Sequence, residues 1–308
     1  MTIRKCFLLK MTLLVGVCGV CLTPAVCAGS QREAGTRDWV DRLVDVGGYR
    51  LHLRCRGEGS PVVLLDTGIG ETYRTWDNVV SELSGETRVC VYDRAGYGES
   101  ERGPFPRTAR RVAGEMVSLT KNGDLGRRFV LVGHSLGGIH SIVFAAEHPE
   151  LVAGIVVVDP PPIDFVTGKR FPNLGRMAEN QTQSFRQLAA ERRQSGDTTQ
   201  AAFFETLASE HEMMFSKSAQ QLGRVSDIGD IPFIVIGSTR ANPAFEDSAA
   251  TFQAFWIKSN QRLASLSDRG KFVLARDASH HVHLDAPEII LAAIREIVNA
   301  ERKEDQAE

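Results

Sequence analysis

Apolar residues recur along the chain with two different periods, and the two patterns alternate from residue 39 onward. Short runs rich in valine, isoleucine and leucine, such as PVVLLD at 61–66 and GIVVVD at 154–159, are typical of strands buried on both faces. Longer segments with apolar residues at helical spacing lie between them, as in LGGIHSIVFAAEHPELV after residue 135. This alternation predicts an α/β protein with a mainly parallel sheet covered by helices.

Eight segments have the short, β-branched composition of strands. The first two, WVDRLVDVGG and YRLHLRCRG, are expected to form an antiparallel pair that turns at Gly47 and Gly48. The other six lie at 61–68, 87–94, 128–135, 153–160, 231–238 and 271–278. Near the end of the chain, APEIILAAIREIVNA has an amphipathic helical pattern. We therefore predict an eight-stranded, mostly parallel sheet flanked by helices.

The strand rhythm stops between Pro160 and about Ile228, where two long segments have helical patterns. Because this stretch lies between two predicted core strands, we expect residues 160–228 to form a helical lid inserted into a core of 29–159 and 229–308. Aromatic and methionine residues of the second segment are candidates for lining a pocket, and ordinary packing is the alternative. These residues are Phe203, Phe204, Met213, Met214 and Phe215.

The first 28 residues have a different pattern. Three basic residues precede an apolar run over 11–26, and small residues follow up to Ala28. This order predicts a secretory signal peptide cleaved after Ala28, and hence a secreted or periplasmic protein. A membrane anchor is the second interpretation, but the run contains Pro24 and is shorter than the roughly 20 residues that cross a bilayer. A lipoprotein is the third, because cysteines lie in this segment.

The charge balance excludes some classes of partner. The formal net charge is -2, so nothing favours nucleic acid or an acidic membrane surface, and a small-molecule substrate is expected. Four of the six cysteines lie in the first 28 residues, which leaves Cys55 and Cys90 in the mature chain. In an oxidising compartment the two thiols would be able to pair. The alternative is two small buried residues, because sequence does not show how far apart they lie.

The segment LVGHSLGGIH at 131–140 carries the first candidate for catalysis. A predicted strand ends at Gly133 and a predicted helix begins directly after Ser135. Such a sharp turn holds the serine in a strained backbone and exposes its hydroxyl above the sheet. It also places the backbone N–H of Leu136, at the helix start, where negative charge on a substrate oxygen would develop. The pattern therefore predicts that Ser135 is a nucleophile.

Further motifs accompany this turn in a fixed order: DTGIG, YDRAGYGES, AAEHPELVAGIVVVDP and ASHHVHLDAPE. With them the chain resembles the α/β-hydrolase superfamily, and in particular its lidded serine hydrolases and esterases. The resemblance covers nearly all of residues 39–300. It implies an acyl-enzyme route that uses Ser135, a histidine and an acid, with no cofactor. Epoxide hydrolases and dehalogenases of this fold use an aspartate nucleophile, and the serine at the elbow argues against both.

The resemblance also implies a position for the histidine. Similar proteins place it after the last strand, seven residues before the proline that opens the final helix. Counting back from Pro287 identifies His280, and His281 is the fallback. Ser279 stands where the family usually has glycine. A metal site is not expected here, because His280, His281 and His283 lack helical spacing and carboxylate partners.

Two residues compete for the role of the acid that orients the histidine. Asp159 directly follows a predicted strand, at the position of an alternative acid in some relatives, and would emerge beside the serine. The usual family position follows the strand at 231–238, which makes Asp247 the rival. A turn cap is the competing interpretation of Asp159. Asp285 is expected to cap the last helix.

The second oxyanion donor is also implied by the resemblance. In relatives it comes from a His-Gly-x element after the third strand, and here the aligned residues are Thr67, Gly68 and Ile69. The backbone N–H of Ile69 is therefore expected to act with that of Leu136. Because Thr67 replaces the family histidine, its supporting hydrogen bonds must come from elsewhere, with Asp66 as a candidate. Asp93 and Arg94 are interpreted as scaffold.

The sequence thus predicts an exported serine hydrolase that cleaves an ester or a related carbonyl bond. The same residues would also serve an acyltransferase. An aminopeptidase-type amide hydrolase would need an acidic pocket for the amine, for which the candidates are Glu205, Glu210 and Glu212. A non-catalytic binding module of the same fold is the alternative from another class.

Overall fold

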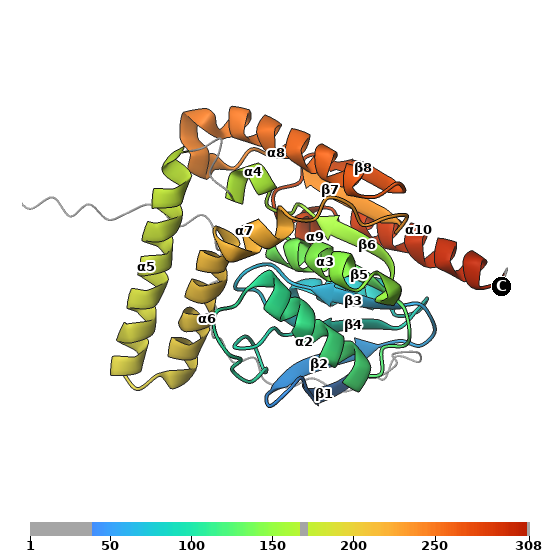
Figure 1. Cartoon of the computed structure of the whole chain (residues 1–308), viewed down its shortest axis with the longest axis horizontal. Coiled ribbons are helices and arrows are strands. Elements are labelled where there is room, and N and C mark those ends of the chain that lie inside the picture. The colour runs from blue at the N-terminus through green and yellow to red at the C-terminus, as the bar shows by residue number, and fades with distance from the viewer. Residues whose placement is uncertain (1–38, 167–171, 307–308) are drawn as a thin grey trace, which may run out of the picture.

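The computed structural model describes residues 39–166 and 172–306. The predicted signal peptide, residues 1–28, lies outside them. An eight-stranded sheet forms the centre of the molecule, with the strand order β1-β2-β4-β3-β5-β6-β7-β8 (Figure 1). The strands β2 to β8 are Arg50–Arg56, Val62–Asp66, Val89–Tyr92, Phe129–His134, Val152–Val158, Phe233–Ser238 and Gly270–Ala275, and β1 is Val40–Asp45.

The first two strands are antiparallel, and the six from β3 to β8 run parallel to one another. The β1–β2 hairpin turns through Gly47 and Gly48, whose φ angles of 112° and 99° lie in the region that favours glycine. In β3, β5, β6 and β7 every residue is buried, as the unbroken apolar runs predicted. The prediction of an eight-stranded, mostly parallel sheet is confirmed.

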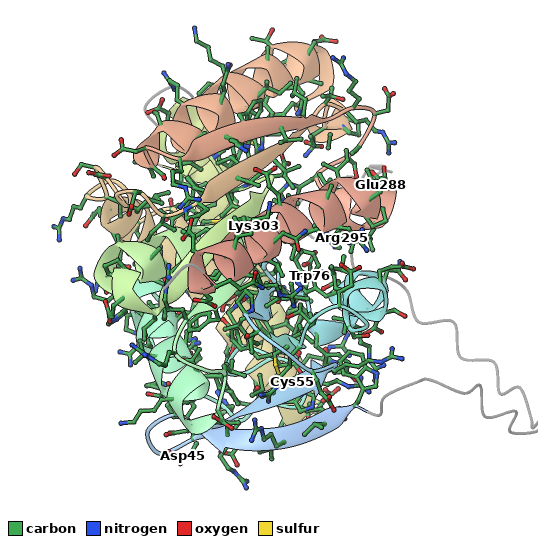
Figure 2. The ribbon with its side chains drawn as sticks, turned by 90° about the vertical axis from the view of Figure 1, so that its right-hand side faces the viewer. Asp45, Cys55, Trp76, Glu288, Arg295 and Lys303 are labelled. Carbon is green, nitrogen blue, oxygen red and sulfur yellow. A yellow bond between two sulfur atoms is a disulfide. The ribbon has the colours of Figure 1, made fainter. Side chains whose placement is uncertain are left out.

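Helices cover both faces of the sheet. On one face pack α2 (Ala109–Asn122), α3 (Leu136–Glu147) and α8 (Ala249–Leu263). On the other pack α1 (Asp77–Leu83) and α10 (Pro287–Asp305). Figure 2 shows α10 crossing this second face, with Glu288, Arg295 and Lys303 along it. Since alternate residues of each strand point to opposite faces, both faces of the sheet carry an apolar core.

Between β6 and β7, within the stretch predicted as a lid, the described residues form four helices. They are α4 (Ile163–Val166), α5 (Pro172–Gln194), α6 (Thr198–Met214) and α7 (Lys217–Leu222). The long helices α5 and α6 form an antiparallel pair at one side of the sheet (Figure 1). Phe185, Leu207 and Ala208 make a small separate core between them. Across 39–166 and 172–306, no helix is both long enough and apolar enough to span a bilayer.

Cys55 and Cys90 form a disulfide, which answers the question that the sequence left open. The two residues are direct partners in the antiparallel pairing of β2 with β4, and both are buried. The bond therefore links the hairpin that opens the fold to the parallel part of the sheet.

Candidate active site

Ser135 lies in the turn between β5 and α3, with φ 51° and ψ -117°. This left-handed backbone is costly for a residue with a side chain, and such strain is concentrated at functional sites. The flanking glycines permit the turn. A Cβ at Gly133 would lie 2.3 Å from the carbonyl oxygen of Gly137, and one at Gly137 would lie 2.7 Å from that of Thr67. The turn thus has the strand-to-helix geometry that the sequence predicted.

His280 follows β8 and faces this serine. Its Nε2 lies 3.0 Å from the Oγ of Ser135, within hydrogen-bond distance. The side chain is 35% exposed, so a substrate would have access to it. The neighbouring His281 turns elsewhere, and its Nε2 lies 3.6 Å from Oε1 of Glu71. The structure therefore brings His280, and not the fallback His281, to the serine.

Asp159 forms a hydrogen bond with Nδ1, the second ring nitrogen of His280. Its Oδ2 lies 2.7 Å from Nδ1 of His280 and accepts a hydrogen bond from Oγ of Ser238 at 3.0 Å. Its Oδ1 accepts from the backbone N–H of Ser238 at 2.9 Å and from Nε1 of Trp256 at 3.0 Å. The rival, Asp247, is an exposed residue of the 3-10 helix Pro243–Ser248. Four donors therefore hold the Asp159 carboxylate in one orientation toward His280.

The expectation that Asp285 caps the last helix is wrong. The cap position of α10 is Ala286, and no side chain caps the helix there. Instead, Oδ2 of Asp285 accepts a hydrogen bond from the backbone N–H of Ser279 at 2.7 Å, and Arg240 lies 3.4 Å from it. The carboxylate therefore holds the residue directly before His280, at the position where relatives have glycine.

The two backbone N–H groups expected at an oxyanion hole come from separate loops. Leu136 is the first residue of α3, where helix geometry leaves N–H groups without intrahelical partners. Ile69 lines the same cavity as Ser135 and His280. The loop before it is anchored, because the backbone N–H of Gly68 donates to Oε2 of Glu71 at 2.7 Å.

Arg94 binds the loop at 66–69 through several hydrogen bonds, which fits its interpretation as a scaffold residue. Its Nη1 lies 2.7 Å from Oδ1 of Asp66, and the guanidinium also donates to the carbonyl oxygens of Thr67 and Gly68 at 2.7 and 2.8 Å. On the other side, its Nε lies 2.9 Å from Oε1 of Glu210 on α6. Burial raises the pKa of both carboxylates, but Arg94 together with neighbouring groups such as His140 brings both pKa values below their ordinary range. This fully buried network joins α6 to the loop at 66–69, where an oxyanion donor is expected.

The cavity beside Ser135 is small, with a volume of about 60 Å³. Its apolar wall comes from Ile69, Pro161, Phe165, Met214 and Trp256. Of the five residues proposed from the sequence as pocket lining, only Met214 is in this wall. Phe203 and Phe204 instead pack against the small core between α5 and α6, so for them the packing alternative holds.

Larger hollows of about 320 and 580 Å³ lie elsewhere, lined in part by residues at the N-terminal ends of the strands. Pro232, next to the start of β7, lines both of them. Because Ser135, Asp159 and His280 all follow the C-terminal ends of strands, these hollows lie away from them. In open α/β sheets, ligands bind at the C-terminal ends of the strands.

The three lid glutamates considered as an amine pocket are all paired with arginines. Glu205 contacts Arg102 and Arg193, Glu210 contacts Arg94, and Glu212 contacts Arg186. None of the three is among the residues that line the cavity. The described part of the chain therefore offers no free carboxylate from this set to bind a substrate amine.

Glu71, His134 and His283 form a cluster next to the serine turn that the sequence did not reveal, and the first two line the same cavity as Ser135. One side-chain nitrogen or oxygen atom from each of the three lies within 4.8 Å of those of the other two, and Glu71 and His134 are hydrogen-bonded to each other. Glu71 places a carboxylate beside His281 and His283, which the sequence did not show. Burial lowers the pKa of His283 to about 2, and neither of its ring nitrogens has a hydrogen-bond partner among the described residues.

Comparison with known proteins agrees with this architecture. A family model described as the alpha/beta hydrolase family matches residues 62–293. The chain belongs to this family. An uncharacterized protein of Bacillus subtilis, YqjL, is 26% identical over 261 residues, which cover 84% of this chain and 92% of YqjL. The 2-(acetamidomethylene)succinate hydrolase of Mesorhizobium japonicum is 31% identical over 121 residues, 39% of this chain and 43% of that enzyme.

Solved structures share the fold of this family member. The enol-lactonase of Burkholderia xenovorans LB400 has a TM-score of 0.59 at 20% identity, covering 84% of this chain and 100% of its own. A thermophilic esterase of Thermogutta terrifontis has a TM-score of 0.57 at 22% identity, covering 86% and 99%. These structures show the fold, while the family match and the named hydrolases among the relatives support an enzyme. Its particular reaction has to be argued from the site.

Proposed function

We propose that this protein is an exported serine hydrolase that cleaves a small ester or lactone. The observation that carries the proposal is the continuous hydrogen-bonded path from Oγ of Ser135 through His280 to Asp159, with distances of 3.0 and 2.7 Å. A hydroxyl becomes a useful nucleophile only with a base in reach, and the base needs a third group to fix its tautomer. Ser135, Asp159 and His280 follow β5, β6 and β8, whose C-terminal ends lie at the same edge of the sheet, and this placement supports the proposal.

In the proposed reaction, Oγ of Ser135 attacks the substrate carbonyl carbon as Nε2 of His280 takes the hydroxyl proton. The carbonyl oxygen becomes an oxyanion, which the N–H groups of Ile69 and Leu136 receive. Collapse of this intermediate breaks the ester bond, and His280 passes its proton to the departing alcohol. A water molecule then attacks the acyl-enzyme as His280 takes its proton. The second tetrahedral intermediate collapses, the bond to Oγ of Ser135 breaks, and His280 returns the proton to that oxygen as the acid leaves. Asp159 stabilises the imidazolium in both halves of the reaction.

The size of the cavity supports a compact acyl group. Pockets for drug-sized ligands usually measure roughly 300–1,000 Å³, whereas the cavity beside Ser135 has a volume of about 60 Å³. Phe165, Met214 and Trp256 limit it, and the first two come from α4 and α6 within the lid stretch while Trp256 comes from α8. We therefore infer that helices α4 to α7 act as the lid that selects the substrate. Turnover of p-nitrophenyl esters is expected to fall steeply from acetate to octanoate.

Export is supported by the disulfide between Cys55 and Cys90, because such bonds persist in oxidising compartments. We propose that the mature protein begins after Ala28. N-terminal sequencing of the protein from the medium or periplasm tests this point. A mature chain that retains its first 28 residues would contradict it.

The serine assignment is tested with a fluorophosphonate probe and the Ser135→Ala variant. The probe is expected to label the wild-type protein at Ser135, and the variant is expected to lose ester turnover while its melting temperature changes little. Ser141→Ala serves as a control, because Ser141 is a buried serine of α3, the helix that follows Ser135, and its hydroxyl donates to the carbonyl oxygen of Gly137. Turnover that survives in Ser135→Ala, or labelling at another residue, would overturn the proposal.

A further inference from the structure

The carboxylate of Glu71 contacts three separate segments around Ser135. Its Oε2 accepts from the backbone N–H of Gly68 at 2.7 Å and lies 3.1 Å from Nδ1 of His134. Its Oε1 lies 3.6 Å from Nε2 of His281. The second ring nitrogen of His134, Nε2, lies 3.0 Å from the carbonyl oxygen of His280. One carboxylate and one imidazole therefore connect the oxyanion loop, the serine turn and the histidine loop.

The two partners of His134 decide how many protons its ring carries. A backbone carbonyl oxygen only accepts hydrogen bonds, and so does an ionised carboxylate. Nε2 must therefore carry a proton to bond with the His280 carbonyl, and Nδ1 must carry one to bond with Glu71. Both bonds exist together only when His134 is an imidazolium. The ring is buried, so this charge requires the carboxylate of Glu71 beside it.

We propose that Glu71 is a positioning residue that keeps His134 doubly protonated and thereby holds the His280 loop and the oxyanion loop in place around Ser135. This proposal rests on the serine hydrolase function proposed above. His134 directly precedes Ser135, so its hydrogen bonds to Glu71 and to the His280 carbonyl hold the residue next to the nucleophile. Neither Glu71 nor His134 touches the reacting serine through any bond described above, and both act through the backbone they hold.

The other titratable groups that face His134 agree with a cation at this position. The rings of His280, His281 and His283 lie with their centroids 4.9, 5.6 and 4.4 Å from that of His134. Burial lowers the pKa of His281 and of His283, and the charge of His134 lowers both further. Asp159 adds negative charge nearby. Burial lowers the pKa of His134, but Glu71, the carbonyl oxygen of His280 and Asp159 together raise the pKa overall.

The variant Glu71→Gln removes the charge and keeps the shape. Both hydrogen bonds of the carboxylate go to Oε2, so a glutamine carbonyl oxygen is able to accept both in its place. Without the negative charge, His134 is expected to lose a proton at lower pH. A neutral ring has one N–H for two acceptors, so the bond to the His280 carbonyl then competes with the bond to residue 71. We expect kcat/KM near the wild-type value in acid, and an alkaline limb at least about one pH unit lower.

Two further variants separate charge from ordinary structural support. Glu71→Asp keeps the charge and shortens the reach, so it is expected to lower kcat at every pH without moving the alkaline limb. Glu86→Gln is the matched control. Glu86 follows α1 and forms an exposed ion pair with Arg295 of α10, and its loss is expected to leave the pH profile unchanged. Figure 2 shows Arg295 on α10.

The protonation state is also measurable without a change at Glu71. In ¹⁵N-labelled Ser135→Ala protein, long-range ¹H–¹⁵N spectra at pH 8 are expected to show both nitrogens of His134 protonated. A singly protonated ring would overturn the proposal. Metal analysis of the purified protein provides a second check, because a divalent ion between Glu71, His134 and His283 would displace the Nδ1 proton. A stoichiometric bound metal would therefore also overturn it.

The outcomes distinguish this proposal from the one on which it rests. Absence of fluorophosphonate labelling at Ser135 in the wild-type protein contradicts the serine hydrolase function itself. Normal labelling of the wild type, combined with a Glu71→Gln profile that coincides with it from pH 6 to 10, contradicts only the positioning role. If Glu71→Gln does not fold, the spectra of the Ser135→Ala protein decide.

Discussion

Replacing Asp159 with asparagine reverses one hydrogen bond at the proposed catalytic histidine. The two donors at Oδ1, the backbone N–H of Ser238 and Nε1–H of Trp256, are unable to act as acceptors. The carbonyl oxygen of the new amide must therefore occupy the Oδ1 position. Its NH₂ group then points to the Oδ2 partners, which are Nδ1 of His280 and the hydroxyl of Ser238. The hydroxyl is able to rotate and accept, but His280 has to change its tautomer.

The magnitude follows from this change of tautomer. With Nδ1 accepting from the amide, the proton of His280 lies on Nε2, which faces Ser135 at 3.0 Å. That nitrogen no longer accepts the serine proton. The same inversion in a serine protease lowers kcat by about 10⁴, or about 5 kcal/mol of transition-state stabilisation. Since the amide still fills the site and makes hydrogen bonds on both sides, we expect the free energy of unfolding to fall by less than about 2 kcal/mol.

The assay is kcat/KM for p-nitrophenyl acetate with Asp159→Asn, Asp159→Ala and Asp247→Asn, beside urea unfolding of each. Asp247 is exposed, so its variant is expected to stay within about twofold of the wild type. Asp159→Ala does not force the wrong tautomer and is expected to be no slower than Asp159→Asn. A folded Asp159→Asn protein that loses less than tenfold in kcat/KM would refute the reasoning.

Three other properties are open to measurement. Cys55 and Cys90 close a loop with a sequence separation of 35. Replacing both with serine is therefore expected to lower the free energy of unfolding, measured with urea, by about 4 kcal/mol. An unchanged urea midpoint would contradict this. Burial lowers the pKa of His211 to about 4. Below about pH 6.5 the unfolded chain binds a proton there that the folded protein does not, so about 3 kcal/mol of stability is lost between pH 6.5 and 4. In His211→Gln the melting temperature should fall less over this interval. A Cβ at Gly137 would lie 2.7 and 2.8 Å from the backbone oxygens of Thr67 and Asp66. Gly137→Ala is therefore expected to reduce turnover of p-nitrophenyl acetate at least about tenfold.

The fold and the serine turn were predictable from local patterns. Strands buried on both faces produce unbroken apolar runs, and the strand-to-helix turn at Ser135 needs glycine on both sides within five residues of sequence. The order of these segments was enough to predict the sheet, the helices on its faces and the family to which the chain belongs. Each of these features depends on residues close together in the chain, so the sequence alone carries them.

Choices between distant residues required the tertiary structure. Asp159 and Asp247 both follow strands, and only the packing of Ser238 and Trp256 shows which carboxylate is held toward His280. Asp285 was expected to cap a helix and instead holds Ser279, because the path of a loop is set by contacts along its whole length.

The same reason explains what sequence did not reveal at all. Glu71 and His134 lie 63 positions apart, and His134 and His280 lie 146 positions apart. Glu210 meets Arg94 across a separation of 116. No periodicity or motif records such pairings, since they arise only when the sheet places the C-terminal ends of its strands side by side and the helices after β6 fold back over them. The sequence determined which elements form, and the packing of those elements decided which buried charges meet.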